Sequence, residues 1–252
     1  MKNNQYNVLS VDSTLFILNE SKDHYLKWLS DNDFPPKSYL EHPLNSEIEL
    51  NEYKKLFLNN FKISLGAFIR IKRVFFILNN TKNYKNNLLY YSFIETPIGL
   101  MVSICSEKGL CLLEFIDRKM LETEINELIN HYDSNLVFKE NEFSLKTKKE
   151  IQMYFYKKLK KFNIELDIIG TDFQKTVWKE LIDIDYGETL SYSEQALLLG
   201  MPNSTRAVAS ANGKNKISII IPCHRVLKKD KKLGGYGGGI YRKKYLLDLE
   251  KD

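Results

Sequence analysis

The spacing of apolar residues divides the chain into three stretches with different expected structures. In residues 1–87, apolar side chains recur at helical spacing around residues 25–29, around 53–57 and from 68 to 78. Pro35 and Pro36 interrupt this pattern, and the polar segment 81–87 is typical of a linker. We therefore expect residues 1–87 to form a helical extension.

Residues 88–168 begin with two β-rich runs, LLYYSFIETPIG and LMVSICSEKGLCLLEFI. The segment 106–109 within the second run predicts a hairpin turn. Amphipathic spacing then predicts helices over 119–132 and 147–160, followed by a short apolar strand at 164–168. This stretch is expected to form a small α+β unit.

Residues 169–252 carry helix signals at their start. Thr171 and Asp172 are N-cap residues for the helix FQKTVWKELIDI, and Ser191 and Glu194 have capping-box spacing before an apolar run that stops at Gly200. A second short helix, TRAVASANG, is expected behind residue 203 or 204. Two short helices joined by such a turn predict a helix-turn-helix, although many other helical pairs share this pattern.

Charge and cysteine content narrow the class of protein. The 252 residues carry 37 basic and 32 acidic groups, but the balance is uneven: residues 167–205 hold 2 and 7, and residues 206–252 hold 12 and 4. The basic C-terminal segment favours a polyanionic partner. No apolar run approaches the roughly 20 residues that span a bilayer, and the N-terminus lacks signal-peptide features. We therefore expect no association with a membrane. The three cysteines are not spaced as in a disulfide-stapled secreted domain, which favours a reducing, cytoplasmic location.

The segment KISIIIPCHRV, residues 216–226, carries the candidate chemistry. Because a free thiol has a pKa of about 8.5, a reactive Cys223 needs an electropositive or base-assisted setting, which His224 and Arg225 offer. Neighbouring side chains of an extended segment point apart, so we expect a bridging water between Cys223 and His224, and a carboxylate on the far nitrogen of His224. The alternative is a buried apolar cysteine at a strand end beside a surface histidine. Cys105 and Cys111 are expected to be buried, inert thiols, and without a CxxC pair no metal site is expected.

Residues from Thr171 to the C-terminus resemble the O6-alkylguanine-DNA alkyltransferases, also called methylated-DNA–protein-cysteine methyltransferases. The matching motifs are FQKTVWKEL, YGETLSY, RAVASANGKN, IPCHRV, GGYGGGIYRKKYLL and Glu250, in the family's order over about 80 residues. With a looser match at residues 88–166, the resemblance covers about two thirds of the chain. It implies an α+β fold: a small N-terminal α/β, ribonuclease H-like domain at 88–168, then a helical winged-helix or helix-turn-helix-like alkyltransferase domain at 169–252, with the helical extension in front.

The resemblance assigns roles to individual residues. Cys223 resembles the thiol that accepts the alkyl group, His224 the base that draws off its proton through water, and Glu250 the carboxylate that orients the histidine. Asn215 matches the asparagine that braces the segment leading to the cysteine. The residues implied in substrate and DNA binding are Tyr192, Arg206, Tyr236, Gly237, Val226, Ala207, Ser210 and Arg225.

Elementary chemistry supports these binding roles. A base inside a duplex cannot reach a cysteine, so it must be flipped out, at a few kcal/mol of unstacking. Arg206 at the helix start can fill the gap, and the alanine, serine and glycine of RAVASANG keep that helix slim enough for a minor groove about 6 Å wide. The resemblance further implies that Tyr192 donates a hydrogen bond to the base, and that the carbonyls of Cys223 and Val226 accept from the amino group of the base. The alternative for the slim helix is a tight helix–helix contact.

Two further motifs each have two possible interpretations. GGYGGG around Tyr236 lacks the lysine pattern and the strand-to-helix context of a phosphate cradle, and we interpret it as a flexible pocket wall. Four lysines around Asp230, expected at a hairpin tip, are either solvated surface or a source of phosphate contacts. They are Lys228, Lys229, Lys231 and Lys232.

Residues 53–73 resemble the second helix-turn-helix of AraC-type transcription factors. The matching positions are Tyr53, Phe57, Ser64, Phe68 and Arg73. Lys62 and Leu65 depart from that family's glycine and proline. The stretch is interpreted either as a degenerate regulatory module or as a helical extension with no DNA-reading role.

The sequence therefore predicts a methylated-DNA–protein-cysteine S-methyltransferase that acts once, without cofactor or metal. It is expected to be a monomer that takes O6-alkylguanine, and O4-alkylthymine, from double-stranded DNA onto Cys223. The alternatives are a lesion-binding protein that transfers nothing and a transcription regulator.

Overall fold

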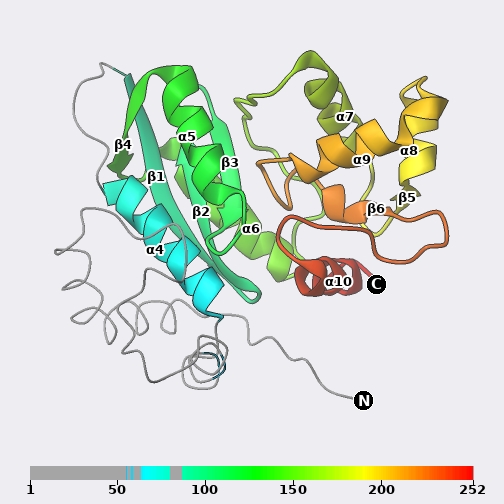
Figure 1. Ribbon diagram of the computed structural model, residues 1–252, viewed down its shortest axis with the longest axis horizontal. Coiled ribbons are helices and arrows are strands. Elements are labelled where there is room, and N and C mark those ends of the chain that lie inside the picture. Colours follow the sequence, from blue (N-terminus) through cyan, green and yellow to red (C-terminus); the bar gives the residue numbers. More distant parts are fainter. Residues whose placement is uncertain (1–54, 56–57, 59–63, 80–86, 252) are drawn as a thin grey trace, which may run out of the picture.

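The computed structural model describes residues 55, 58, 64–79 and 87–251 (Figure 1). Helix α4, Leu65–Asn79, precedes a four-stranded sheet with its own helices, and a mainly helical part follows. The predicted α+β class is confirmed.

The sheet has the strand order β3-β2-β1-β4. Strand β1 (Asn87–Thr96) pairs antiparallel with β2 (Gly99–Cys105), which pairs antiparallel with β3 (Leu110–Phe115). The predicted hairpin at 106–109 is confirmed, since the Ser106 amide donates to the Gly109 carbonyl at 2.9 Å. Strand β4 (Ser134–Phe138), which pairs parallel with β1, was not predicted from the sequence.

The second predicted helix of this unit has different bounds in the structure. Helix α5 spans Leu121–Tyr132, close to the prediction, but α6 spans Glu142–Phe155 and not 147–160. A capping box between Asn141 and Ser144 fixes its start, and the positive φ of Lys157 follows its end. The predicted strand at 164–168 is also wrong: this segment makes one isolated bridge, from Leu166 to Leu110.

Two hydrophobic cores lie on the two faces of the sheet. Helices α4 and α5 share one cluster with residues from β1 and β2, including Phe68, Leu89 and Leu128. Helix α6 lies on the opposite face, and its Tyr154 joins a cluster that continues into the C-terminal helices. The C-terminal part therefore shares its core with the sheet.

The C-terminal part contains α7 (Asp172–Ile182), α8 (Tyr192–Leu198), α9 (Thr205–Gly213) and α10 (Ile240–Leu249). Short strands β5 (Leu190–Ser191) and β6 (Val226–Leu227) pair in parallel, and the 3-10 turns η2 (Pro202–Ser204) and η3 (Cys223–Arg225) lie between helices and strands. The predicted caps at Thr171 and Ser191 are confirmed as full capping boxes. The predicted helix pair is confirmed as α8 and α9 (Figure 1).

Nine of the 21 residues of the AraC-like stretch, Tyr53 and Phe57 among them, lie outside the described residues. Its last part is the start of α4, where Phe68 is buried in the core. Arg73 Nη1 lies 3.6 Å from Glu122 Oε2 of α5. Helix α4 thus packs on the sheet unit, and the AraC resemblance stays a prediction.

Candidate active site

Cys223 is delivered by a series of tight turns and not by the extended segment that the sequence predicts. Ile219 has φ 73°, and the Ile220 amide donates to the Ser218 carbonyl at 2.9 Å, which closes a γ-turn. Pro222 (φ −84°, ψ 59°) forms an inverse γ-turn, with the Cys223 amide bonded to the Ile221 carbonyl at 2.8 Å. Cys223 then begins the 3-10 turn η3. The β-branched run is buried on all sides, so its composition reflects core packing and not a strand.

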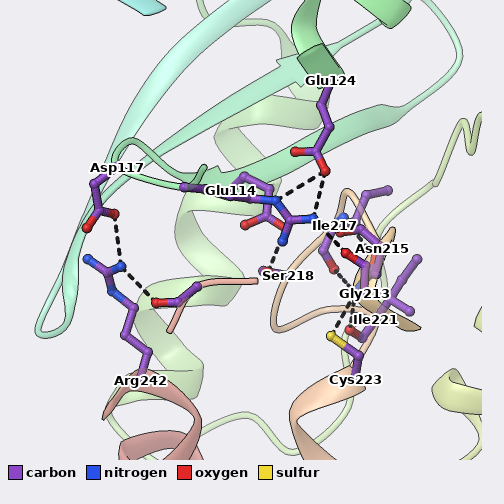
Figure 2. Close-up of polar contacts among 12 residues, drawn as sticks. Glu114, Asp117, Glu124, Gly213, Asn215, Ile217, Ser218, Ile221, Cys223 and Arg242 are labelled. Carbon is purple, nitrogen blue, oxygen red and sulfur yellow. Dashed lines mark hydrogen bonds and ion pairs between the residues drawn. The ribbon is translucent and has the colours of Figure 1, made fainter. Parts of the chain in front are cut away.

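Asn215 holds this turn and contacts the sulfur. Its Nδ2 donates to the Ile221 carbonyl at 2.8 Å and to Cys223 Sγ at 3.3 Å, while its Oδ1 accepts from the Ile217 amide at 2.9 Å (Figure 2). Burial raises the pKa of the Cys223 thiol, and the Asn215 hydrogen bond opposes that shift. The thiol therefore needs a base to become a nucleophile.

His224 and Glu250 form a closed pair beside the thiol. His224 Nε2 lies 2.8 Å from Glu250 Oε1, which also accepts from the Tyr154 hydroxyl at 2.7 Å. Burial lowers the pKa of His224 and so favours the neutral ring. Burial alone would raise the pKa of Glu250, but His224 and Arg225 hold it well below its usual range. His224 Nδ1 is buried and has no hydrogen-bond partner within the described part of the chain, which leaves it free to accept a proton.

Arg225 differs from its expected role at the DNA. It is buried, its Nε and Nη2 lie 2.9 and 3.0 Å from the two oxygens of Glu250, and its Nη1 donates to the Ile184 carbonyl. A guanidinium enclosed by these partners holds the Glu250 carboxylate in place and is not free for phosphate.

Tyr192 and Tyr236 lie close to Cys223: burial raises the pKa of both hydroxyls, and the charge of Cys223 raises it further. The Tyr192 hydroxyl is 3.5 Å from the Gly235 carbonyl, and a Cβ added to Gly234 would meet that hydroxyl at 2.6 Å. The Tyr236 ring lies edge-on to the His224 ring, with centroids 6.4 Å apart. The missing side chain at Gly234 thus lets Tyr192 pack directly on the glycine-rich segment, and the pocket wall stays a prediction.

Lys243 is a buried site residue that the sequence reasoning missed. Its Nζ donates to the Val226 carbonyl at 2.5 Å and lies 5.9 Å from the Tyr192 ring centre. Burial lowers its pKa to about 8. The signal was its position three residues before the buried Leu246 on α10, since this spacing puts both on one helix face. The Val226 carbonyl, expected to receive the base, already accepts one hydrogen bond.

The residues expected at the DNA lie on one exposed face of α9. Arg206, Ala207 and Ser210 are exposed, whereas Val208 and Ala211 of the same helix are buried. The four lysines around Asp230 are also mostly exposed, and the Lys228 amide donates to the Lys232 carbonyl at 3.0 Å across a turn.

Cys105, Cys111 and Cys223 are free and buried. Among the described residues, no group of three His, Cys, Asp or Glu side chains is placed to hold a metal ion. Within the same part of the chain, no helix is both long and apolar enough to cross a membrane.

Sequence profiles of two protein domains match this chain. The 6-O-methylguanine DNA methyltransferase ribonuclease-like domain matches residues 89–168, and the DNA-binding domain of the same family matches residues 172–252. The chain belongs to the 6-O-methylguanine DNA methyltransferase family. The resemblance seen in the sequence is thereby confirmed, including the fold of an α/β domain followed by a helical domain.

Two curated members of the family are similar to this chain over nearly their whole length. The methylated-DNA–protein-cysteine methyltransferase of Methanosarcina barkeri is 42% identical over 165 residues, which is 65% of this chain and 98% of the relative. That of Methanosarcina acetivorans is 39% identical over 163 residues, 64% of this chain and 98% of the relative. These relatives bear the name of the predicted activity, so a protein that binds lesions without transfer is not favoured.

Solved structures of the family are similar as well. A crystal structure of Mycobacterium tuberculosis OGT in complex with DNA is 39% identical, with a TM-score of 0.55, and covers 64% of this chain and 92% of that protein. A structure of the Mycobacterium tuberculosis O6-methylguanine methyltransferase is 42% identical, with a TM-score of 0.54.

Proposed function

We propose that this protein repairs O6-alkylguanine in double-stranded DNA by moving the alkyl group onto Cys223, and that it treats O4-alkylthymine in the same way. The observation that carries the proposal is the arrangement of Cys223 between the Asn215 amide and the paired His224 and Glu250. Membership in a family of methylated-DNA–protein-cysteine methyltransferases supports it.

The proposed transfer begins with the loss of the thiol proton. His224 Nδ1 takes the proton through a water, and Glu250 stabilises the imidazolium that forms. The Cys223 thiolate attacks the alkyl carbon, so an S–C bond forms as the C–O6 bond breaks. The electron pair of the broken bond passes to guanine, whose anion takes up one proton from solvent, while the His224 imidazolium returns the thiol proton to solvent. Tyr192 stands as a hydrogen-bond donor to the base. The product is a thioether, so each molecule acts once.

The DNA contact is proposed on the exposed face of α9. Arg206 would take the place of the flipped nucleotide in the stack, and Ala207 and Ser210 would lie against the minor groove. The solved complex of a 39% identical relative with DNA supports this choice of partner.

We also propose three domains, at 1–87, 88–168 and 169–252, in a monomer that works in the cytoplasm. Three free thiols fit a reducing compartment. Size-exclusion chromatography with light scattering tests the monomer, since a concentration-independent dimer mass would contradict it.

The decisive experiment compares wild type with Cys223→Ala on a duplex that carries one O6-methylguanine. Peptide mass spectrometry of wild type should show one added methyl on the peptide containing Cys223, and restored guanine in the DNA. Cys223→Ala should bind the duplex and leave the lesion intact, and Cys105→Ala is the matched control that should transfer normally. Tight lesion binding by wild type with an unmodified Cys223 would overturn the proposal in favour of a binding protein.

A further inference from the structure

A buried arginine, Arg118, joins the α/β domain to the segment that precedes Cys223 in the chain. Arg118 lies in the loop after β3, and its side chain is 3% exposed. Its Nη1 lies 3.0 Å from Glu114 Oε1, and its Nε and Nη2 lie 3.1 and 2.7 Å from Glu124 Oε1. Two carboxylates of the same domain therefore fix the orientation of this guanidinium.

The same guanidinium reaches across to the C-terminal domain. Arg118 Nη2 donates to the carbonyls of Gly213 and Asn215, each at 3.1 Å. Figure 2 shows Gly213 and Asn215 next to Cys223, with Glu114 and Glu124 on the side of the sheet. Arg118 thus holds the backbone of the residue whose side chain bonds to the cysteine sulfur.

Arg118 is part of a wider interface between the two domains, in which β3 contacts residues 216–218. The Leu113 amide donates to the Lys216 carbonyl at 2.9 Å, and the Ser218 amide to the Leu113 carbonyl at 2.8 Å. The Ser218 hydroxyl donates to Glu114 Oε1 at 2.7 Å. These bonds fix residues 216–218, the start of the segment between Asn215 and Cys223, against the edge strand β3.

The glycine-rich segment around Tyr236 also packs directly against Arg118. A Cβ at Gly237 would lie 1.7 Å from Arg118 Nη1, so the backbone next to Tyr236 approaches the guanidinium directly. Because four acceptors hold that guanidinium, it cannot move aside easily, and only glycine fits at position 237.

A buried charge cluster is expensive, and apolar residues of similar volume stabilise a fold as well or better. The Arg118 cluster is therefore poorly explained by stability alone. We propose that Arg118 is a positioning residue for alkyl transfer: by holding the carbonyls of Gly213 and Asn215, it keeps the Asn215 amide directed at the sulfur of Cys223. This rests on the transfer function proposed above.

The charge of Arg118 favours the thiolate form of Cys223, as does the Asn215 amide that Arg118 positions. The titratable and charged groups that face the thiol come from several elements, and they are Glu114 of β3, Arg118 of the following loop, Lys243 of α10, Tyr192 of α8, and Tyr236 of the glycine-rich segment. Arg118 and Lys243 lower the pKa of Cys223, and Glu114 raises it. Loss of Arg118 would therefore move the thiol pKa further upward.

The test uses Arg118→Lys, which keeps the charge but cannot reach all the acceptors at once. Single-turnover transfer should slow by roughly 10- to 100-fold, since a misplacement of about 1 Å costs on that order. The pH midpoint for alkylation of Cys223 by iodoacetamide should rise even though the charge is kept, because a displaced Asn215 amide no longer lowers the thiol pKa. Leu128→Ala, a cavity in the opposite core, is the control for lost stability, and its folded fraction should transfer at the wild-type rate.

A double-mutant cycle with Asn215→Ala separates positioning from general structural support. In the Asn215→Ala protein, Arg118→Lys should change the rate by less than about twofold, because the residue it acts through is gone. Wild-type rates for Arg118→Lys, or a full loss that persists in the Asn215→Ala background, would overturn the proposal. The iodoacetamide profile needs no DNA, so it still tests the link between Arg118 and Cys223 if wild type fails to transfer a methyl group.

Discussion

His224 Nε2 and Glu250 Oε1 meet at 2.8 Å, and neither side chain is more than 1% exposed. The contact leaves Nδ1 as the nitrogen that can accept a proton, since a neutral imidazole can carry a proton on only one nitrogen. Glu250 also binds Arg225 and Tyr154, so its orientation is fixed from three sides. The pair is thus held in one geometry before DNA arrives, which suits the base catalysis that we propose.

The first prediction concerns the charge of Glu250. Glu250→Gln keeps the shape but removes the charge that stabilises an imidazolium, and it allows the wrong tautomer of His224. Transfer should slow by roughly 100-fold or more in single-turnover assays. Glu165→Gln removes a carboxylate that pairs with Lys146 at the surface, and it should leave the rate unchanged. A Glu250→Gln rate within threefold of wild type would rule out this role.

The second prediction concerns acid stability. Burial lowers the pKa of His224 below its ordinary 6.5, so the unfolded chain binds the proton first as the pH falls. The free energy of unfolding should therefore decrease as the pH drops below about 6.5, toward the folded pKa. Urea denaturation between pH 7.5 and 5 measures this slope, and His224→Gln should remove the part due to this ring. An identical slope in both proteins would contradict the assignment.

The third prediction separates stacking from charge at Arg206. Both Arg206 variants are made in a Cys223→Ala background. Arg206→Ala should abolish the fluorescence rise of a 2-aminopurine placed at the lesion. Arg206→Lys should recover more of the wild-type DNA affinity than of the wild-type fluorescence rise, which reports base flipping. Lys214→Ala removes one exposed charge at the far end of α9 and should change the salt slope by at most about one. In the Arg206→Ala single variant, which retains Cys223, iodoacetamide should react with the thiol at the wild-type rate. Undiminished flipping by Arg206→Ala would exclude the stacking role.

The fourth prediction concerns α4, which lies in front of the segment that the family profiles cover. Leu78 is buried in the core that α4 shares with α5, so Leu78→Ala should lower the free energy of unfolding by about 2–5 kcal/mol. Leu145→Ala, on an exposed position of α6, should cost about 0.5 kcal/mol or less. Equal urea midpoints for the two variants would show that α4 adds nothing to this core.

Much of the fold follows from local signals that the sequence displays. The capping residues Thr171 and Ser191 and the hairpin turn at 106–109 act within a few residues, so they were predictable. Strand β4 has only five residues, and its place next to β1 depends on pairing across the chain. The start of α6 was misjudged because Asn141 and Ser144 cap it before its apolar stripe begins.

The site shows the same division between local and distant signals. The sequence motifs predicted that Cys223, His224, Asn215 and Glu250 gather, and the structure places them together. The tight turns before Cys223 were missed because a β-branched run favours a strand in isolation. The interface contact made by Arg118 was missed because its partner Asn215 lies 97 positions away. No local pattern marks a pair of that kind.

The stoichiometry of transfer tests the proposed repair function most directly. The protein is incubated with an excess of duplex carrying a labelled O6-methylguanine, and the label bound to protein is counted until it stops rising. We predict a plateau at one methyl group per molecule, all of it in the peptide that contains Cys223, with an equal amount of guanine restored. Continued turnover beyond one equivalent, or label on any other residue, would contradict single transfer to Cys223.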